Sequence, residues 1–469
     1  MTEVDQIRET ILSSISETSN FGETPNVEGV YLPISHVKAL RLEANLVVGS
    51  RGVGKSFWTA ALKSNELRRR VGLVVPEIDS VEIRIGFGNR EVINEFPNAD
   101  TFSNLLDAGL EPYDIWRAVI IRWIASRNGQ QLPTASWEAS VRWVRANPED
   151  AARIMEMPRS WRGLILFDAL DRTSTDWSRM DNIVRGLLRA VLWLKTYSGL
   201  YAKVFLREDQ AERTVFNFPD ASKLLATKAE LDWSRHDLHG LLWQLLINAP
   251  GTHGELAREI CISVSGNPPE IVNKVWTLPD EMMRESEAQR NAFERVAGPW
   301  MGRDRRRGIP YSWSVGHLAD ARGRTSPRSF LAAIRQAAED SRERYNLYSY
   351  PLHFESIKRG IQKASAIRVQ EVAEDYPWVP DVLWKISGIN VPCDIEVILN
   401  QWLQVFPSGP PITTTSLPAQ HVERGWDGIF QDLQRLGMVE LKKDGRLDMP
   451  DLYRVGFKLG RKGGVKPQG

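Results

Sequence analysis

Cysteine is nearly absent from this chain of 469 residues, in which Cys261 and Cys393 are the only two. Two cysteines so far apart in the sequence exclude a disulfide framework and a cysteine-based metal site. The chain also lacks an excess of charge of one sign, because 60 basic residues face 59 acidic ones and leave a net charge of +1. This balance excludes a protein coated in positive charge but leaves local basic patches open.

Long hydrophobic runs are missing as well. No apolar stretch approaches the roughly eighteen residues that a membrane-spanning helix needs. The N-terminal sequence MTEVDQIRETILSS is polar and acidic and has no secretory pattern. We therefore expect a cytoplasmic protein that has no membrane partner.

The composition that is present is typical of a globular protein, with 42% hydrophobic and 25% charged residues. The length predicts two or three domains. Strand patterns alternate with helical ones up to about residue 235, which predicts an α/β fold with a parallel sheet. Beyond that point helical patterns dominate. The predicted parts are an N-terminal helix and entry segment at 1–40, an α/β core at 41–235, a helical domain at 236–345, and a helical and winged-helix domain at 346–469.

Apolar patterns predict the elements of the core. Strands are expected at 44–48, 81–87, 164–167 and 202–206, and helices at 55–70, 113–126 and around 183–194. Near the C-terminus, a helix at 426–436 precedes two short strand-like runs around the turn 443–445. That order is the outline of a winged helix.

The sequence GSRGVGKS at residues 49–56 matches the pattern G-x-x-x-x-G-K-[ST]. Glycines let backbone N–H groups surround phosphates, and the helix that follows turns its positive dipole end towards the anion. Lys55 adds a cation for the β- and γ-phosphates, and the Ser56 hydroxyl can bind Mg²⁺. The apolar strand before the loop argues against a chance match. The predicted nucleotide-binding residues are Gly49, Ser50, Arg51, Gly52, Val53, Gly54, Lys55, Ser56 and Phe57.

A carboxylate at the end of a second strand should supply another Mg²⁺ contact. The run LILF ends in Asp168, which we predict as a metal ligand together with Ser56. Asp171 follows at the mouth of the strand, where it could orient the attacking water. The alternative is a buried strand that ends in a solvated turn. A glutamate has this role in vigorous ATPases, so its absence predicts slow turnover.

Arg207 ends the strand KVFL and is the third predicted catalytic element. Its guanidinium could reach the terminal phosphate and report whether that phosphate is present. The alternative is a surface arginine paired with Glu208 or Asp209. Other nucleotide classes fit less well, because no N/T-K-x-D guanine clamp and no LSGGQ-like signature are present. We therefore predict ATP and Mg²⁺ as the cofactors.

The segments GSRGVGKS, LILFDALD and VFLRED, in that order, resemble the additional-strand P-loop ATPases, the group that holds the AAA+ and STAND proteins. The resemblance covers residues 25–345. It implies an extra strand between the loop strand and the acidic strand, with Arg207 as the sensor at its end. It also implies that GNPP at 266–269 begins a helical lid and that Arg328 contacts the nucleotide as a second sensor.

The layout is also similar to STAND or KAP-like ATPases of bacterial antiviral defence. STAND proteins carry a large sensor repeat array, and this chain shows no internal repeat. The resemblance therefore implies that a partner or the C-terminal part does the sensing.

Basic residues gather in two further places. The sequence MGRDRRRGIP at 301–310 carries Arg303, Arg305, Arg306 and Arg307. One of these could act on a neighbouring subunit's nucleotide, or the loop could contact nucleic-acid phosphates, or it could be merely solvated. The predicted wing and tail carry further cations that could contact DNA, namely Lys442, Lys443, Arg446, Lys458, Arg461, Lys462 and Lys466.

Together these features predict an ATPase that acts as a molecular switch. It would bind ATP·Mg²⁺, hydrolyse it slowly, and self-assemble into a homo-oligomer or engage a partner effector. One alternative is a DNA-binding ATPase that loads on or remodels DNA through its winged helix. Another is a scaffold that binds nucleotide only for stability.

Overall fold

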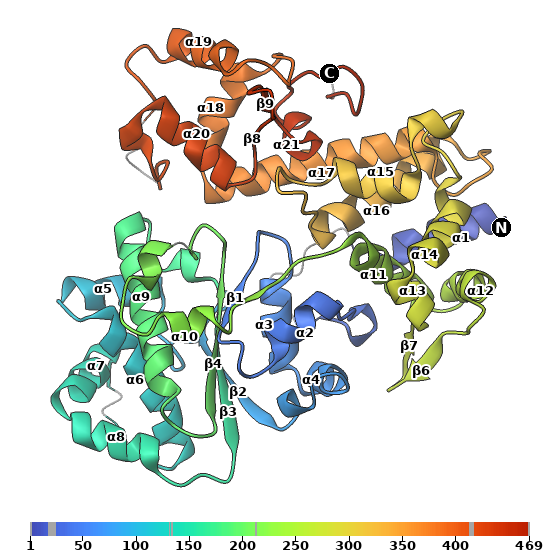
Figure 1. Ribbon diagram of the computed structural model, residues 1–469. Coiled ribbons are helices and arrows are strands. Elements are labelled where there is room, and N and C mark those ends of the chain that lie inside the picture. Colours follow the sequence, from blue (N-terminus) through green and yellow to red (C-terminus); the bar gives the residue numbers. More distant parts are fainter. Residues whose placement is uncertain are drawn as a thin grey trace. The chain divides into compact units, whose positions relative to one another are not determined.

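The computed structural model describes residues 2–16, 25–130, 132, 135–211, 213–411 and 417–467. The chain divides into two compact units (Figure 1). The core unit contains Leu32–Asp232. The helical unit contains Trp233–Gly469 together with Asn26–Tyr31 and the N-terminal helix α1 (Glu3–Ser14). The finer division into four parts stays a prediction.

The core unit is built on a parallel sheet of five strands in the order β2–β3–β4–β1–β5. The strands are β1 (Leu46–Val48), β2 (Val81–Phe87), β3 (Arg162–Phe167), β4 (Leu200–Leu206) and β5 (Ala229–Glu230). Helix α3 lies on one face of this sheet, and α6 and α9 lie on the other (Figure 1). The helices of this unit are α2 (Ile34–Leu40), α3 (Lys55–Lys63), α4 (Asn65–Gly72), α5 (Ala99–Asp107), α6 (Pro112–Arg127), α7 (Trp137–Ala146), α8 (Pro148–Glu156), α9 (Trp177–Leu194) and α10 (Ser222–Leu225).

The predicted α/β fold with a parallel sheet is confirmed. Strand β4 lies between β1 and β3, which is the position of the additional strand in the P-loop ATPases named above. The prediction of a single helix at 55–70 is wrong, because α3 ends at Lys63 and α4 begins at Asn65. Ser64 leaves the helical conformation between them, and its side chain accepts a hydrogen bond from the Leu67 N–H. Ser64 thus caps α4.

An aromatic cluster supports the carboxyl end of β3. The fully buried Trp116 ring lies edge-on to Phe167, with ring centroids 5.4 Å apart, and its Nε1–H donates to the Ile183 carbonyl. Gly86 in β2 leaves the space that Phe167 fills, since a Cβ at Gly86 would lie 2.4 Å from that ring. The packing therefore fixes the position at which β3 ends.

Lys203 is a charged residue in the middle of β4 that has no exposed surface. Its ammonium donates hydrogen bonds to the carbonyl oxygens of Ala39 (2.6 Å), Arg41 (2.9 Å) and Ala44 (2.8 Å). Burial lowers the pKa of Lys203 to about 7. The three carbonyls belong to the last turn of α2 and to the segment that follows it, so this lysine ties the entry to β1 onto the sheet.

We predict that Lys203→Met lowers the free energy of unfolding by about 3 kcal/mol, because it leaves two buried carbonyl groups and a partly buried one without their donor. Chemical denaturation followed by circular dichroism measures the change. Lys195→Met is the control, since Lys195 is exposed and its ammonium bonds only the Asn45 side chain. Equal, small effects of the two substitutions would contradict this role.

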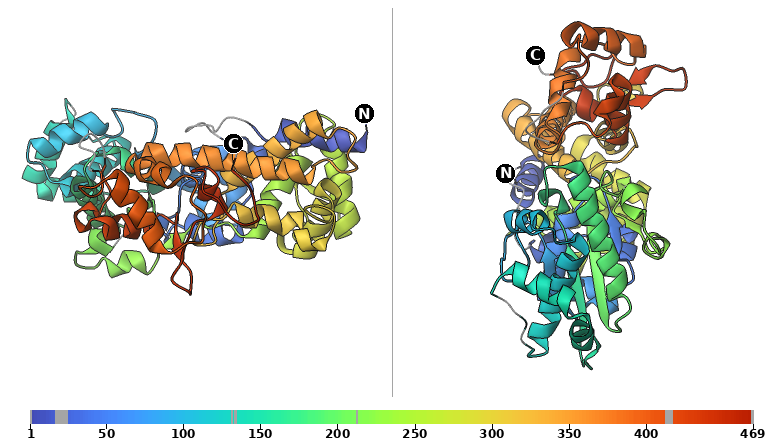
Figure 2. Two further views of the ribbon diagram at one scale, coloured as in Figure 1. Left: turned by 90° about the horizontal axis from the view of Figure 1, so that it is seen from above. Right: turned by 90° about the vertical axis from the view of Figure 1, so that its left-hand side faces the viewer.

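The helical unit is dominated by two long helices that lie along each other, α16 and α17 (Figure 2). Gly360 of α17 allows the close approach, because a Cβ there would lie 2.2 Å from the Ala333 carbonyl oxygen of α16. The helices of this unit after α1 are α11 (Arg235–Ile247), α12 (Gly254–Ser265), α13 (Asp280–Arg284), α14 (Ser286–Ala297), α15 (Pro310–His317), α16 (Pro327–Arg344), α17 (Phe354–Asp375), α18 (Trp378–Leu383), α19 (Ile395–Val405), α20 (Trp426–Arg435) and α21 (Asp451–Arg454).

Two hairpins complete the helical unit. The first, β6 (Glu270–Val272) with β7 (Val275–Thr277), was not expected. Asn273 and Lys274 both have positive φ at its turn, as a two-residue hairpin loop requires. The second, β8 (Glu440–Leu441) with β9 (Leu447–Asp448), follows α20 as the sequence predicted. Within the described residues, no helix combines the length and the apolar character needed to cross a bilayer.

Candidate nucleotide-binding site

The loop between β1 and α3 has the backbone geometry of a phosphate cradle. Gly52 and Gly54 have φ of +81° and +108°, a region that favours glycine. A Cβ at Gly49 would lie 2.7 Å from Val53 Cγ2 and 3.2 Å from Leu231 Cβ. Helix α3 then begins at Lys55, and the N–H groups of its first turn lack partners within the helix. The residues present therefore fit a nucleoside triphosphate.

Lys55 lies in this loop with its ammonium turned back onto the main chain. Nζ donates to the carbonyl oxygens of Gly49 and Ser50, each at 2.8 Å. Burial lowers the pKa of Lys55 to about 8, although the negative charge of Asp168 opposes this shift. An anion placed at the cradle would add negative charge beside the ammonium and favour its protonated form.

Asp168 follows β3 directly and is 3% exposed. Burial raises its pKa, while a hydrogen bond from Ser56 and the charge of Lys55 act in the opposite direction. The next residue, Ala169, adopts a left-handed backbone with φ of +58°, an unusual conformation for a residue with a Cβ. This turn sends the chain into the short 3₁₀ helix Leu170–Arg172, which carries Asp171.

Asn89 is a site residue that sequence reasoning missed. It follows β2, and its side-chain N–H donates to the Ser56 hydroxyl oxygen at 3.2 Å. The Arg172 guanidinium in turn donates to the Asn89 carbonyl oxygen at 3.3 Å. A polar residue at the end of a strand next to β3 was the available signal. Asn89 therefore orients the hydroxyl that we predict as a Mg²⁺ ligand.

Arg207 and Asp171 lie together at the carboxyl ends of β4 and β3. Their side chains form an ion pair with an N–O distance of 3.7 Å, and Arg207 forms a second one with Asp209, also at 3.7 Å. The Arg207 N–H donates to the Gln210 side chain at 3.1 Å. Asp209 and Gln210 are both nearly buried and were not predicted as site residues. The alternative of an arginine on the open surface does not fit, since Arg207 is 8% exposed.

The core unit thus brings together most of the predicted residues. Lys55, Ser56, Asp168, Asp171 and Arg207 meet where the carboxyl ends of the strands converge, through pairings such as Val48 with Leu206. Among the described residues, no group of three or more His, Cys, Asp and Glu side chains could hold a metal ion. Mg²⁺ would therefore depend on Ser56, Asp168 and phosphate oxygens, as it does in other nucleotide sites.

The remaining predicted residues belong to the first turn of α3 or to other elements. Phe57 is in the first turn of α3 and lies edge-on to the Trp58 ring. Arg328 belongs to the helical unit, where its guanidinium pairs with Glu371 of α17. Its role as a second sensor stays a prediction. Gly266 ends α12 with φ of +75°, and the chain continues into the β6–β7 hairpin, so GNPP does not begin a helix.

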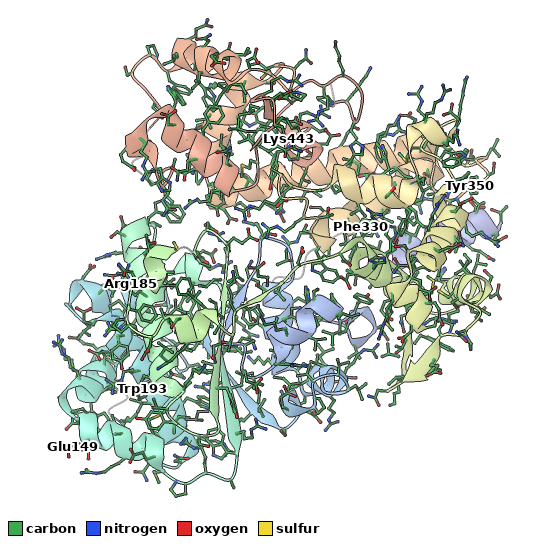
Figure 3. All side chains as sticks on the ribbon, viewed as in Figure 1. Glu149, Arg185, Trp193, Phe330, Tyr350 and Lys443 are labelled. Carbon is green, nitrogen blue, oxygen red and sulfur yellow. The ribbon has the colours of Figure 1, made fainter. Side chains whose placement is uncertain are left out.

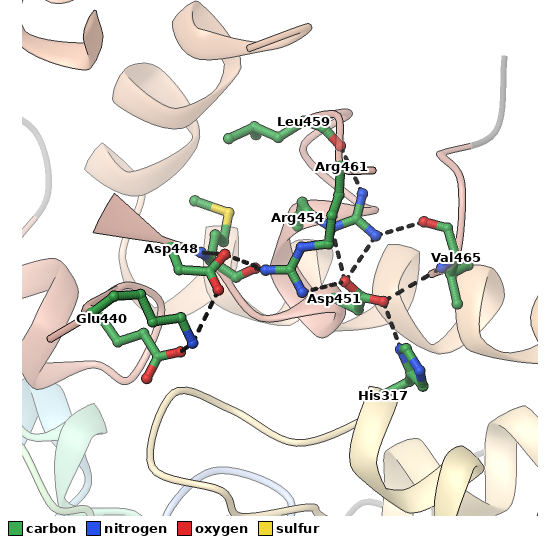
Figure 4. A network of polar contacts seen from close by, with 10 residues as sticks. His317, Glu440, Asp448, Asp451, Arg454, Leu459, Arg461 and Val465 are labelled. Atoms are coloured by element: carbon green, nitrogen blue, oxygen red, sulfur yellow. Dashed lines mark hydrogen bonds and ion pairs between the residues drawn. The ribbon is translucent and has the colours of Figure 1, made fainter. Parts of the chain in front are cut away.

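The cations of the predicted C-terminal wing and tail are partly neutralised by acidic residues (Figure 4). Lys442 pairs with Glu440 and Asp448, and Arg461 pairs with Asp448 and Asp451. Arg446 pairs with Asp444 at the wing turn. Lys443, at the same turn, is exposed (Figure 3). These pairs reduce the charge that the wing offers to DNA, and DNA binding through the wing stays a prediction.

Asp451 is the centre of the same network. Burial acts to raise the pKa of Asp451, but hydrogen bonds from His317 and Arg454 outweigh this effect. The pKa of Asp451 is therefore lowered to about 2. The Arg454 guanidinium, which is 1% exposed, also donates to the carbonyl oxygens of Leu459 and Val465. The network therefore holds the C-terminal residues against α21 and α15.

The comparisons with known proteins cover family models, curated proteins and solved structures. No family model and no curated protein matches the chain. Among solved structures, the chain is similar to the ORC2 protein of Aeropyrum pernix, solved as ADPNP and ADP complexes. The two share 11% identity over 88% of this chain and 85% of that chain, with a TM-score of 0.29. A TM-score this low carries no weight, so the P-loop fold of the core rests on its strand order and loop geometry.

The lowered pKa of Lys55 predicts how nucleotide binding depends on pH. In the free protein Lys55 loses its proton as the pH rises through about 8. A bound triphosphate raises this pKa again, so binding at pH 8.5 should take up about three quarters of a proton and weaken as the pH rises further. Calorimetry of ADP and ATP analogue binding in buffers of different ionisation enthalpy measures this uptake.

Lys55→Arg is the matched control, because a guanidinium stays charged throughout this range. Its nucleotide affinity should be lower at pH 7 but should not change between pH 7 and 9. Proton uptake that is the same in the wild type and in Lys55→Arg would assign the effect to another group.

Proposed function

We propose that this protein is an ATP-binding and slowly hydrolysing molecular switch. The observation that carries the proposal is the convergence of a glycine cradle, a lysine, two carboxylates and an arginine at the carboxyl ends of three adjacent parallel strands. The ATP-bound state would self-assemble or engage a partner effector. A place in bacterial antiviral defence is supported only by the sequence resemblance.

Different residues of the chain bind the phosphates and the metal ion. The N–H groups at the start of α3 hold the phosphates, and Lys55 exchanges the Gly49 and Ser50 carbonyl oxygens for phosphate oxygens. Ser56 and Asp168 would hold Mg²⁺, with Asn89 fixing the Ser56 hydroxyl. Mg²⁺, when bound, neutralises the charge that develops on the phosphate oxygens.

The Arg207–Asp171 pair connects sensing to hydrolysis. With an N–O distance of 3.7 Å, the pair is a weak ion pair in which each partner can be drawn away. A γ-phosphate competes with Asp171 for the guanidinium and leaves the carboxylate able to accept a proton from water. Asp171 is therefore free to act as a base only when a triphosphate is bound. The absence of a glutamate next to Asp168 keeps hydrolysis slow.

Because Asp171 and Arg207 act as one unit in this scheme, their substitutions should not be additive. We predict that Asp171→Ala and Arg207→Ala each retain ATP binding and slow hydrolysis by about 10²-fold. The double variant should be no slower than the slower single variant. Phosphate release under single-turnover conditions measures all three.

Two further variants serve as the negative and positive controls of this experiment. Lys55→Ala should abolish nucleotide binding, whereas Arg162→Ala, at the opposite end of β3, should leave hydrolysis unchanged. Normal hydrolysis by Asp171→Ala would show that Asp171 is not the base. Tight binding without phosphate release from the wild type would favour the nucleotide-binding scaffold instead.

If the protein is a switch that self-assembles, its molar mass in solution should change when nucleotide binds. A non-hydrolysable ATP analogue with Mg²⁺ should increase the molar mass measured by light scattering, in the absence of DNA, and Lys55→Ala should not respond. A mass increase that requires duplex DNA would favour the DNA-loading ATPase. An unchanged mass with saturating nucleotide would exclude self-assembly as the output.

A further inference from the structure

A second cluster of charge lies in the helical unit, on the segment between α14 and α15. Residues 301–308, the arginine loop, have the sequence MGRDRRRG. Arg303, Arg305, Arg306 and Arg307 are all exposed, and the one acidic residue among them is Asp304. The nucleotide site described above uses none of these residues.

The backbone of the arginine loop is closed by its own hydrogen bonds. The Met301 N–H donates to the Gly308 carbonyl oxygen at 2.9 Å and joins the two ends of the loop. Arg305–Arg307 form a 3₁₀ helix, which the Asp304 side chain caps by accepting from the Arg306 N–H. The loop therefore holds its arginines on a defined backbone.

Packing fixes both glycines of the loop. A Cβ at Gly302, where φ is +150°, would lie 3.1 Å from Cγ of Arg307. A Cβ at Gly308, where φ is +97°, would lie 2.9 Å from Cδ1 of Trp313. Met301 is 2% exposed and anchors the loop in the unit. A residue with a Cβ at position 302 would displace the aliphatic part of Arg307, and one at position 308 would displace the Trp313 ring.

The charges of the loop are not balanced from within the described part of the chain. Asp304 pairs with Arg306 at 3.0 Å. For Arg303, Arg305 and Arg307 the described residues offer no ion pair. Three exposed arginines thus lie within five consecutive residues of one short loop, in a chain whose net charge is only +1. Such an arrangement is stabilised by a partner that carries several negative charges.

We propose that the arginine loop binds the phosphate backbone of duplex DNA. Several guanidinium groups in one short loop exceed what the single terminal phosphate of a neighbouring subunit's nucleotide requires. Trp313, the ring that packs on this loop, already lies against the His317 ring, with centroids 4.0 Å apart and ring planes inclined by 38°. The loop therefore offers charge rather than a platform for unpaired bases, which favours a duplex over a single strand.

The test is the salt dependence of DNA affinity. A fluorescein-labelled 30-base-pair duplex is titrated with the full-length protein, without nucleotide, at several salt concentrations from 50 to 200 mM, and fluorescence anisotropy gives the affinity. Removing three phosphate contacts in Arg303→Ala/Arg305→Ala/Arg307→Ala should lower the affinity at least tenfold at 50 mM salt. The loss of affinity between 50 and 200 mM salt should also shrink by about fortyfold.

Three variants make the result specific. Arg142→Ala/Arg153→Ala/Arg284→Ala removes the same charge from exposed arginines that each pair with a carboxylate, and it should bind as the wild type does. The triple Arg→Lys variant of the loop keeps the charge and should retain most of the affinity. Lys55→Ala should bind DNA normally, which separates this proposal from that of the nucleotide site.

Several outcomes would overturn the proposal. These are a wild type that does not bind the duplex at 50 mM salt, a loop variant with unchanged affinity and salt dependence, and equal losses in the loop variant and the charge-matched control. Loss of binding in a Lys443→Ala/Lys462→Ala/Lys466→Ala variant alone would place DNA at the wing. Unchanged DNA binding with impaired ATP hydrolysis in the assembled protein would assign the arginines to a neighbouring subunit's nucleotide.

Discussion

The position of the glycine loop between two strand ends is the constraint on which the rest of the site depends. The Gly49 N–H donates to the Leu206 carbonyl oxygen at 3.1 Å, and the Leu231 N–H donates to the Val48 carbonyl oxygen at 2.8 Å. Gly49 can pass through this gap only because it has no Cβ to meet Leu231. The end of β4, and with it Arg207, is thereby fixed beside the start of α3. The geometry needed for phosphate binding is therefore a property of the sheet as well as of the loop.

Buried charges of both signs surround this position, and each depends on the others. Lys55 and Arg207 face Asp168, Asp171 and Asp209, of which Asp168, Asp209 and Arg207 are buried while Lys55 and Asp171 are half-buried. Burial lowers the pKa of Lys55 and raises that of Asp168, so burial opposes the charged form of both groups. A triphosphate with its metal ion would favour the charged forms of the two together. Binding is in this sense linked to the protonation of the site.

Much of this arrangement follows from sequence patterns that are local. The run 49–56, the strand that ends in Asp168 and the strand that ends in Arg207 each carry their own signal, and parallel pairing brings their ends together. Asn89 had only a weak signal, a polar residue at the end of a strand, and that signal does not show which loop residue will reach Ser56. The salt bridges of the wing were missed for a similar reason, since Asp451 lies outside the predicted wing. The β6–β7 hairpin depends on two non-glycine residues with positive φ, which have no strong sequence signature.

A crystal structure of the protein with a non-hydrolysable ATP analogue and Mg²⁺ tests the central claim most directly. The account predicts phosphates surrounded by the N–H groups of residues 52–56, with the Lys55 ammonium moved from the Gly49 and Ser50 carbonyl oxygens to the phosphates. It also predicts that the Arg207 guanidinium has left Asp171 for the terminal phosphate. Crystals grown at saturating analogue that show nucleotide bound elsewhere, or none at all, would contradict it.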